Sequence, residues 1–287
     1  MEFVKAHGTG NDFILLPDLD DTMELTGPLT AMLCTPHTGL GADGAIRSAP
    51  ARAGVDADVF MDYRNADGSL SEMCGNGVRT VAKYIFDRQL VSGDRLRVDT
   101  RGGVKVVQVA GRDAHGLVTL VRVDMGIPEP GAVETLQIDA EGNPTEVEVT
   151  TVSMGNPHAV VLVEDVPTAP VRTAGPSIAT HPRFPEGTNV EFITAEGPAR
   201  VRGRIWERGV GETLASGTGA SAMAVAAHMR GLAGREVDVA LPGGVLAIDW
   251  SGDRLFVTGP AVEVASGTLD PRWVASLPHP PQQKVRA

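Results

Sequence analysis

The sequence contains two short glycine-rich segments of the same form, one in each half. The first is Met73-Cys74-Gly75-Asn76-Gly77 and the second is Ala215-Ser216-Gly217-Thr218-Gly219. Each segment follows a strand-like stretch and opens an apolar, helix-like run, so Cys74 and Ser216 each stand at a predicted helix N-terminus. A repeat of this kind predicts two similar halves.

The repeat extends towards the start of each half. Asn11 lies in a glycine turn before the apolar stretch 13–16, and Asn156 lies in a similar turn before the apolar stretch 159–163. The distance along the chain from each Asn to the later Cys or Ser is nearly the same. We therefore expect the two halves to have arisen by duplication.

The repeat predicts an α+β fold of two pseudosymmetric domains. The runs 78–86 and 220–229 are apolar or small, which suits a buried helix, and the stretches 95–123 and 237–264 are rich in strand formers and glycine. We expect a mostly antiparallel sheet wrapped around each helix rather than a parallel doubly wound sheet, with the active site in the cleft between the domains.

The chain has 287 residues, enough for two cores. We expect the following division: an N-terminal lobe over 1–117 with Cys74, completed by a strand near 259–275; a C-terminal lobe over 118–258 with Ser216; and a frayed tail over 276–287.

Composition excludes several functions. A net charge of −11 argues against binding of nucleic acid, and no apolar run is long enough for a membrane span. The seven histidines form no metal-binding motif, and none of the four lysines suggests a Schiff base, so we expect neither a metal nor pyridoxal phosphate. With only two cysteines and no signal peptide at its start, the chain is expected in the cytoplasm.

The two repeated segments suit binding of a small anion. The first N–H groups of a helix lack acceptors within the helix, so two such termini can bind a carboxylate. A cysteine at that place also acquires a lowered pKa. The alternative for Cys74 is a buried small hydrophobe, which is the interpretation that we keep for Cys34 in its apolar surroundings.

Nine motifs, in order along nearly the whole chain, resemble the diaminopimelate epimerase family. They are HGTGNDF (7–13), GLGADG (39–44), NADGS (65–69), MCGNGVR (73–79), MGNPH (154–158), GTNVEF (187–192), WERGVGET (206–213), ASGTGA (215–220) and LPGG (241–244). The resemblance implies a cofactor-independent isomerase that converts L,L- to meso-diaminopimelate and works as a homodimer.

The resemblance also implies roles for individual residues. Cys74 matches one catalytic cysteine, and Ser216 stands where the second is expected. The rest of the implied site comprises a distal clamp of Asn65, Asn156, Asn189 and Arg208, amino-group ligands Asn11 and Glu207, and backbone N–H donors of Gly75, Asn76, Gly217 and Thr218. These residue types suit a zwitterion. Arginine can bind a carboxylate with two parallel N–H groups, and the asparagine amide offers both a donor and an acceptor.

Each of these residues also has a purely structural interpretation. The three asparagines 11, 156 and 189 lie in turn-like contexts, where asparagine is common, and Glu207 with Arg208 could form a solvated ion pair. We expect His7 and His158 to be hydrogen-bonding groups outside the reaction itself.

Ser216 leaves the activity of this chain open, because a serine hydroxyl is a far weaker acid than a thiol. An engineered change, a natural paralogue with altered chemistry, and a protein that binds without turnover all fit. We expect an impaired epimerase. The alternatives are an epimerase, racemase or eliminase of another amino acid, and an inactive amino-acid-binding protein.

Overall fold

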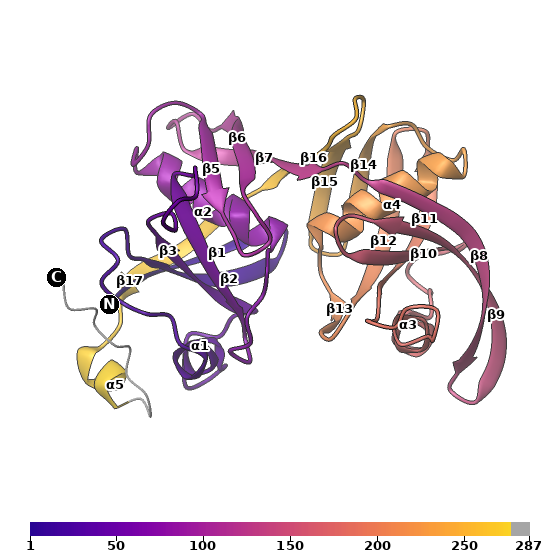
Figure 1. Cartoon of the computed structure of the whole chain (residues 1–287), viewed down its shortest axis with the longest axis horizontal. Coiled ribbons are helices and arrows are strands. Elements are labelled where there is room, and N and C mark those ends of the chain that lie inside the picture. The colour runs from indigo at the N-terminus through magenta and orange to yellow at the C-terminus, as the bar shows by residue number, and fades with distance from the viewer. Residues whose placement is uncertain (277–287) are drawn as a thin grey trace. The chain divides into compact units, whose positions relative to one another are not determined.

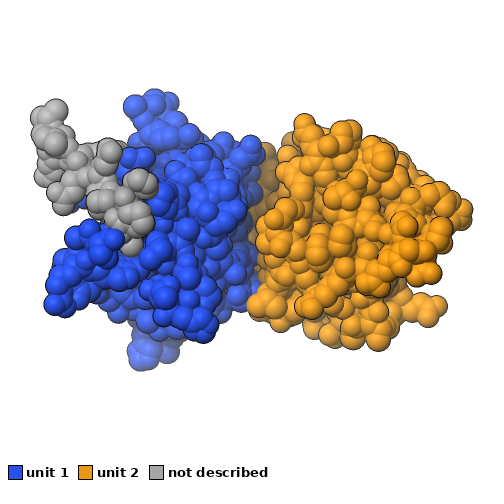
Figure 2. Space-filling model, turned by 90° about the horizontal axis from the view of Figure 1, so that it is seen from below, with its two compact units in different colours: residues 1–123, 259–287 blue, residues 124–258 orange. Residues whose placement is uncertain are grey.

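The computed structural model describes residues 1–276 (Figure 1). The chain divides into two compact units, drawn in two colours in Figure 2. Unit 1 comprises Met1–Val123 and the chain from Gly259 onward, and unit 2 comprises Asp124–Thr258.

The sequence predicts the first division at 117/118, the start of strand β7 (Val118–Gly126). Most of β7 instead belongs to unit 1, because it pairs with the preceding strand as far as Val123. The tail expected over 276–287 lies, apart from its first residue, outside the described residues.

Unit 1 is built on one curved sheet. Its neighbouring strands, in spatial order, are β17 (Val262–Thr268), β1 (Glu2–Gly8), β2 (Asn11–Pro17), β3 (Gly44–Ala49), β4 (Val59–Asn65), β5 (Arg95–Asp99), β6 (Lys105–Arg112) and β7. All pairs are antiparallel except β2–β3 and β4–β5. Ala261, just before β17, donates its N–H to Thr119 on β7, so the two ends of the sheet approach each other.

Helix α2 (Gly75–Asp87) lies inside this sheet (Figure 1). It contacts β1, β2, β4, β6 and β17, and every residue from Gly75 to Phe86 is buried. Two further helices, α1 (Gly27–Cys34) and α5 (Pro271–Ala275), belong to the same unit. Leu29 and Leu33 of α1 pack with Ile14 and Leu16 in a second cluster of apolar side chains.

Unit 2 repeats this plan. Its neighbouring strands are β8 (Glu129–Ala140), β9 (Asn143–Ser153), β10 (Pro157–Leu162), β11 (Asn189–Gly197), β12 (Arg200–Glu207), β14 (Glu236–Leu241), β15 (Gly244–Asp249) and β16 (Leu255–Pro260), with the short β13 (Gly211–Thr213) also beside β12. Helix α4 (Gly217–Met229) is surrounded by these strands, and α3 (Val171–Ala179) packs on β8, β11 and β12.

The two units share one pairing pattern. From β1 to β5, the successive pairs are antiparallel, parallel, antiparallel and parallel, and the series β9, β10, β11, β12 and β14 has the same order. Both central helices have 13 residues. The predicted pair of pseudosymmetric α+β domains, each with a mostly antiparallel sheet around a central helix, is therefore confirmed.

Glycine allows each central helix to lie close to its sheet. A Cβ added to Gly77 would stand 2.9 Å from Ile46 Cδ1, and a Cβ added to Gly219 would stand 2.9 Å from Ile205 Cδ1. Ordinary van der Waals contact needs a longer separation. The shared glycines thus fix how deeply the helix N-terminus sits in each unit.

Candidate active site in two half-sites

The half-site of unit 1 is centred on Cys74. This residue is the N-cap of α2 and has an extended backbone, with φ −136° and ψ 115°. Its side chain makes no capping hydrogen bond, and Sγ instead lies 3.6 Å from Asn11 Oδ1 as a donor. The thiol is therefore directed to a neighbouring side chain and not to the start of its own helix.

Asn11 is held in place by several hydrogen bonds. Its Nδ2 donates to Asp43 Oδ2 at 2.8 Å, and its Oδ1 accepts from Asn76 Nδ2 at 3.1 Å. Arg79 Nη2 in turn donates to Asn76 Oδ1 at 2.8 Å. Three of the predicted residues, Asn11, Cys74 and Asn76, thus lie together in one hydrogen-bonded cluster.

Asn65 takes part in a different set of contacts. Its Nδ2 donates to Ser69 Oγ and its Oδ1 accepts from the Tyr63 hydroxyl, both at 3.0 Å. Its backbone N–H also donates to the Ser69 carbonyl. In this structure the Asn65 amide therefore stabilises its own turn, as expected from asparagine in such a context.

The half-site of unit 2 is centred on Ser216, the N-cap of α4. Its backbone is extended like that of Cys74, with φ −135° and ψ 132°. Unlike the thiol, the Ser216 hydroxyl caps the helix: Oγ accepts from the Gly219 N–H at 3.2 Å and lies 3.3 Å from Thr218 Oγ1. The two equivalent positions thus share backbone geometry but differ in side-chain bonding.

A buried polar pair lies beside this second helix N-terminus. His158 Nδ1 and Glu191 Oε1 are 2.6 Å apart, and neither side chain is exposed. His158 Nε2 also lies 3.0 Å from Asn156 Oδ1. Burial raises the pKa of the Glu191 carboxyl, against the opposing effect of His158.

Glu191 is not among the residues that the sequence predicts for the site. A Cβ on Gly219 would stand 3.1 Å from Glu191 Oε1 and 3.2 Å from Ser216 Cβ, so the carboxyl lies under the first turn of α4. The signal was a lone acid inside the apolar strand Val190-Glu191-Phe192-Ile193. A buried charged side chain in such a strand requires a partner, and His158 provides it.

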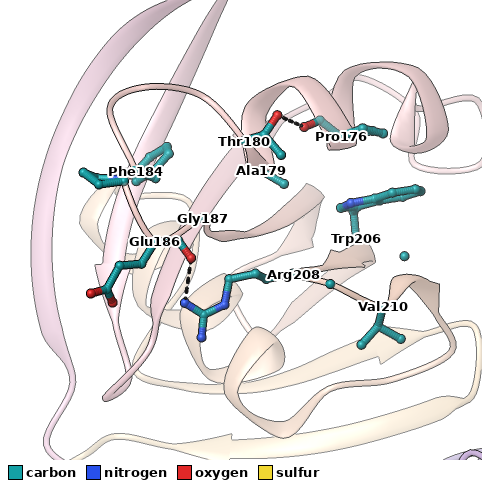
Figure 3. A pocket seen from close by; sticks show the side chains of 12 residues that line it. Pro176, Ala179, Thr180, Phe184, Glu186, Gly187, Trp206, Arg208 and Val210 are labelled. Atoms are coloured by element: carbon teal, nitrogen blue, oxygen red, sulfur yellow. Dashed lines mark hydrogen bonds between the residues drawn. The ribbon is translucent and has the colours of Figure 1, made fainter. Parts of the chain in front are cut away.

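Asn189 and Arg208 lie together in unit 2. Asn189 Oδ1 accepts from the Arg208 backbone N–H at 3.0 Å, and its Nδ2 donates to the Pro157 carbonyl at 3.2 Å. Arg208 Nη1 donates to the Glu186 carbonyl at 3.0 Å, as Figure 3 shows. Neighbouring Glu207 accepts from the Thr213 hydroxyl, so the two adjacent charged side chains have different partners.

Arg208 also lines a pocket of about 590 Å³ within unit 2 (Figure 3). Much of the remaining lining is apolar and comes from α3 and from Phe184, Trp206 and Val210, and Glu186 also lines the pocket. The pocket thus combines charged side chains with hydrophobic surface. Such a pocket suits a chain with a charged end.

The two cysteines differ in their surroundings. Cys34 is buried at the end of α1, and burial raises the pKa of its thiol to about 12. Cys74 is half-buried at a helix N-terminus. A thiol is reactive as its thiolate, so the structure favours Cys74 as the reactive one.

The described residues, 1–276, include no cluster of three or more His, Cys, Asp or Glu side chains suited to a metal ion. Over the same range, none of the helices is long and apolar enough to cross a membrane.

Solved structures show the fold class of the chain. A probable proline racemase from Agrobacterium radiobacter has a TM-score of 0.72 at 16% identity, covering 94% of this chain and 93% of that one. A phenazine biosynthesis protein of the PhzF family from Bacillus anthracis has a TM-score of 0.69 at 17% identity, covering 93% and 98%. The chain therefore shares the α+β fold of these proteins.

Sequence comparison identifies the family within this class. The family model described as "Diaminopimelate epimerase" matches residues 3–129 and 150–264. Proteins named diaminopimelate epimerase are 46% identical to this chain in Pelotomaculum thermopropionicum and 42% identical in Heliobacterium modesticaldum. These matches cover 93% and 94% of this chain and 98% and 99% of the two relatives. The chain belongs to the diaminopimelate epimerase family.

Proposed function

We propose that this protein epimerises L,L-diaminopimelate to the meso isomer by moving a proton at one α-carbon, without a cofactor. The observation that carries this proposal is the pair of equivalent helix N-caps, Cys74 and Ser216, each with extended backbone at the start of a buried helix. The family membership supports the substrate. Diaminopimelate is a precursor of lysine and peptidoglycan, so the protein would serve their synthesis.

In the proposed reaction, the Cys74 thiolate removes the α-proton from one face of the carbon. The proton forms an S–H bond to Cys74 Sγ, and the electron pair of the broken C–H bond remains on the α-carbon and its carboxylate as a carbanion. A proton delivered from the opposite face, on the side of Ser216, then completes the inversion. The backbone N–H groups of both helix starts would hold the reacting carboxylate and stabilise its added charge.

The remaining residues would bind the substrate. The proposed carboxylate donors are Gly75, Asn76, Gly217 and Thr218, the distal clamp is Asn65, Asn156, Asn189 and Arg208, and the amino-group ligands are Asn11 and Glu207. Asn11, Asn189 and Arg208 already have fixed orientations in their own units. Preorganised ligands of this kind lower the entropy lost on binding.

Ser216 would slow one of the two proton transfers. A hydroxyl without a strong base does not become an anion at neutral pH, and here Oγ is occupied as the helix cap. We infer that epimerisation is impaired relative to a two-cysteine site.

The test is proton NMR of L,L- and meso-diaminopimelate, incubated separately with the protein in deuterium oxide. Interconversion of the isomers supports the proposed epimerase. Loss of an α-proton without interconversion supports Cys74 as the single working base, and it should vanish in Cys74→Ala. Absence of both changes would reject the proposed reaction.

A protein that binds the amino acid without turnover is the second candidate. The serine at position 216 favours it, because a hydroxyl is a far weaker acid than a thiol and needs an adjacent base to accept a proton from substrate. Saturable binding of diaminopimelate, measured by calorimetry, without deuterium exchange would support this function over the epimerase. Turnover of another amino acid would instead support a racemase or eliminase of different specificity.

We also propose that the protein acts in the cytoplasm as a homodimer, on the basis of the family resemblance. Sedimentation equilibrium of the whole chain tests the dimer. A mass equal to that of one chain at micromolar concentration would contradict it.

A further inference from the structure

Arg79 on α2 is a cation enclosed by the protein. It is fully buried, and it is among the largest fully buried side chains in the structure. Its guanidinium donates to the Pro260 carbonyl at 3.1 Å, the Gly75 carbonyl at 3.3 Å, Thr9 Oγ1 at 2.7 Å and Asn76 Oδ1 at 2.8 Å. All four acceptors are neutral.

Arg79 has no carboxylate within ion-pair distance among the described residues. Every other fully or nearly buried cation in unit 1 has one: Arg47 pairs with Asp18, and Lys83 pairs with Asp87. Removal of a charge from water is unfavourable unless an opposite charge compensates it. Burial accordingly lowers the pKa of Arg79 to about 10, and the one opposing influence is Cys74.

The equivalent helix in unit 2 shows that this cation is not needed for helix structure. Ser221 occupies the place on α4 that Arg79 occupies on α2, four residues after the first helical glycine. The Ser221 hydroxyl donates to the Gly217 carbonyl at 2.8 Å, just as Arg79 donates to the Gly75 carbonyl. A small neutral side chain therefore satisfies the helix, and the charge is specific to the half-site that carries the thiol.

A chain of polar groups links the guanidinium to the sulfur. Arg79 donates to the Asn76 amide oxygen, and the Asn76 amide nitrogen donates to Asn11 Oδ1, which also accepts from Cys74 Sγ. The guanidinium thus holds the Asn76 amide in the orientation that fixes Asn11. It also places a positive charge behind the helix N-terminus at which Cys74 sits.

We infer that Arg79 is the buried counter-ion of the Cys74 thiolate. It acts as a positioning residue, because it orients Asn76 and so fixes Asn11 beside the sulfur. Its charge favours the thiolate, against the hydrogen bond from the thiol to Asn11 Oδ1, which favours the neutral form. Its use in catalysis rests on the proposed function, in which Cys74 removes the α-proton. The positive end of the α2 dipole acts in the same direction.

Other charged groups at this end of unit 1 are already paired or bonded. They are Asp43, bonded to Asn11; Asp12, paired with Lys5; Asp62, paired with Arg101; and His7, whose Nδ1 accepts from the Gly10 N–H. Asp12 and Asp43 carry negative charge and oppose a thiolate, so Arg79 must outweigh them.

The test is the pH dependence of alkylation of Cys74 in the whole chain. Iodoacetamide reacts with the thiolate, and mass spectrometry of the Cys74 peptide separates this reaction from that of Cys34. The midpoint is the pH at which the alkylation rate of Cys74 reaches half its maximum. In the unchanged protein, we expect this midpoint to lie at least about one pH unit below the ordinary thiol pKa of about 8.5. A midpoint at or above that value would overturn the inference without any variant.

Variants then assign the effect to the charge. We expect Arg79→Gln to raise the midpoint by about one pH unit or more, because loss of an adjacent opposite charge has that effect. Arg79→Lys should retain most of the lowered value. If the folded Gln variant keeps the original midpoint, or if Lys raises it as far as Gln does, Arg79 is not the counter-ion. Circular dichroism confirms that the variants compared are folded.

Lys83→Gln is the matched control, since it removes another buried cation from the same helix, one turn further on. Its midpoint should stay near that of the unchanged protein, and a rise equal to that of Arg79→Gln would overturn the inference.

The two proposals, epimerisation and the Arg79 counter-ion, can fail separately. A midpoint that depends on Arg79 without any deuterium exchange would reject the proposed reaction alone, whereas exchange with a midpoint independent of Arg79 would reject the counter-ion alone.

Discussion

The two half-sites differ in one side-chain atom at the helix N-cap, which is sulfur in Cys74 and oxygen in Ser216. Cys74 and Ser216 have nearly the same backbone angles at the starts of equivalent helices, yet only the serine caps its helix. Hydroxyl oxygen is a good acceptor for a backbone N–H, whereas a thiol is a weak one. The serine therefore gains helix stability from the same atom that a proton transfer would need.

The first prediction concerns Ser216→Cys. A thiol at this position should cap α4 less well, leaving it available for proton transfer near the helix N-terminus. We expect interconversion of diaminopimelate isomers to rise by about 10²- to 10⁴-fold, the usual contribution of a positioned acid or base. The measurement is the initial rate of isomer interconversion by NMR.

Ser216→Ala serves as the control, since it removes the hydroxyl without supplying a thiol. It should leave the rate at or below that of the unchanged protein. An equal rate in the Cys and Ser forms would show that position 216 is not the missing acid or base.

The sequence was most informative where residue type and spacing coincide. It predicted Asn11, Cys74 and Asn76 as members of one site, and hydrogen bonds join them. It did not predict Asp43, Arg79 or Glu191 as neighbours, because their contacts depend on strand register and on the depth of a helix in its sheet. A buried charge is visible in sequence only as an acid or base in an apolar run.

At the scale of elements, the central helices depend on glycine. Gly77 and Gly219 each lie at the third position of the helix, against a strand residue of the sheet. This close approach sets where the first N–H groups of the helix point. The helix start is thus part of the site as well as part of the core.

The second prediction concerns Gly219→Ala. The new Cβ would stand 2.9 Å from Ile205 Cδ1, 3.1 Å from Glu191 Oε1 and 3.2 Å from Ser216 Cβ. We expect a loss of about 1–3 kcal/mol in the free energy of unfolding, as for other overpacked cores. Urea denaturation measures it.

Gly252→Ala is the matched control in the same unit, because a Cβ there meets nothing within 4 Å. Its free energy of unfolding should change by no more than about 0.5 kcal/mol. If Gly219→Ala is as stable as Gly252→Ala, the helix start has more room than the structure indicates.

The third prediction concerns acid stability and the end of β5. Asp99 is buried, and its carboxylate accepts three hydrogen bonds from Arg52. The donors are the Arg52 backbone N–H, Nε at 2.7 Å and Nη2 at 2.6 Å. These hydrogen bonds hold the pKa of Asp99 below its ordinary value. Asp99→Asn should therefore lose about 1–2 kcal/mol at pH 7, allowing for the half-exposed arginine.

The pH dependence follows from the sign of this shift. A carboxyl with a lowered pKa in the folded state contributes its full stability above the unfolded pKa, and that stability is lost as the pH falls through the folded value. The difference between the unchanged protein and Asp99→Asn should shrink below about pH 4. Exposed Asp56→Asn is the control and should change little at either pH. A constant difference between pH 7 and pH 3 would contradict the assignment.

Elements with a repeat were easier to predict than elements without one. The equivalence of the two halves predicted both central helices and the sheets around them. Helices α1 and α3 were not predicted. The signal for α1 was present, since Thr26 caps it and Pro28 lies in its first turn. Helix α3 contains Pro176, which argues against a helix in sequence alone.

At the scale of the whole molecule, each unit carries some of the residues that we propose bind substrate. Unit 1 supplies Asn11, Asn65 and Cys74, whereas unit 2 supplies Asn189 and Arg208. Each unit has its own core and its own helix N-terminus, as expected from a duplication. A duplication would place the same kind of helix start in both units of a chain that is proposed to act on one carboxylate at a time.

The fourth prediction is that both units bind the same substrate molecule. The whole chain should bind one molecule of L,L-diaminopimelate, measured by isothermal titration calorimetry. Asn11→Ala in unit 1 and Arg208→Lys in unit 2 should each weaken that single binding event by about 10- to 100-fold, because each removes a hydrogen bond to a charged group or a bidentate contact. Exposed arginines in ion pairs offer controls in each unit, so Arg97→Lys and Arg172→Lys should leave the affinity within about twofold.

Two binding events per chain, each sensitive to a variant in only one unit, would show that the halves act separately. A single event weakened by both variants would instead require groups from both halves at one ligand, which explains why the duplicated units have remained joined in one chain.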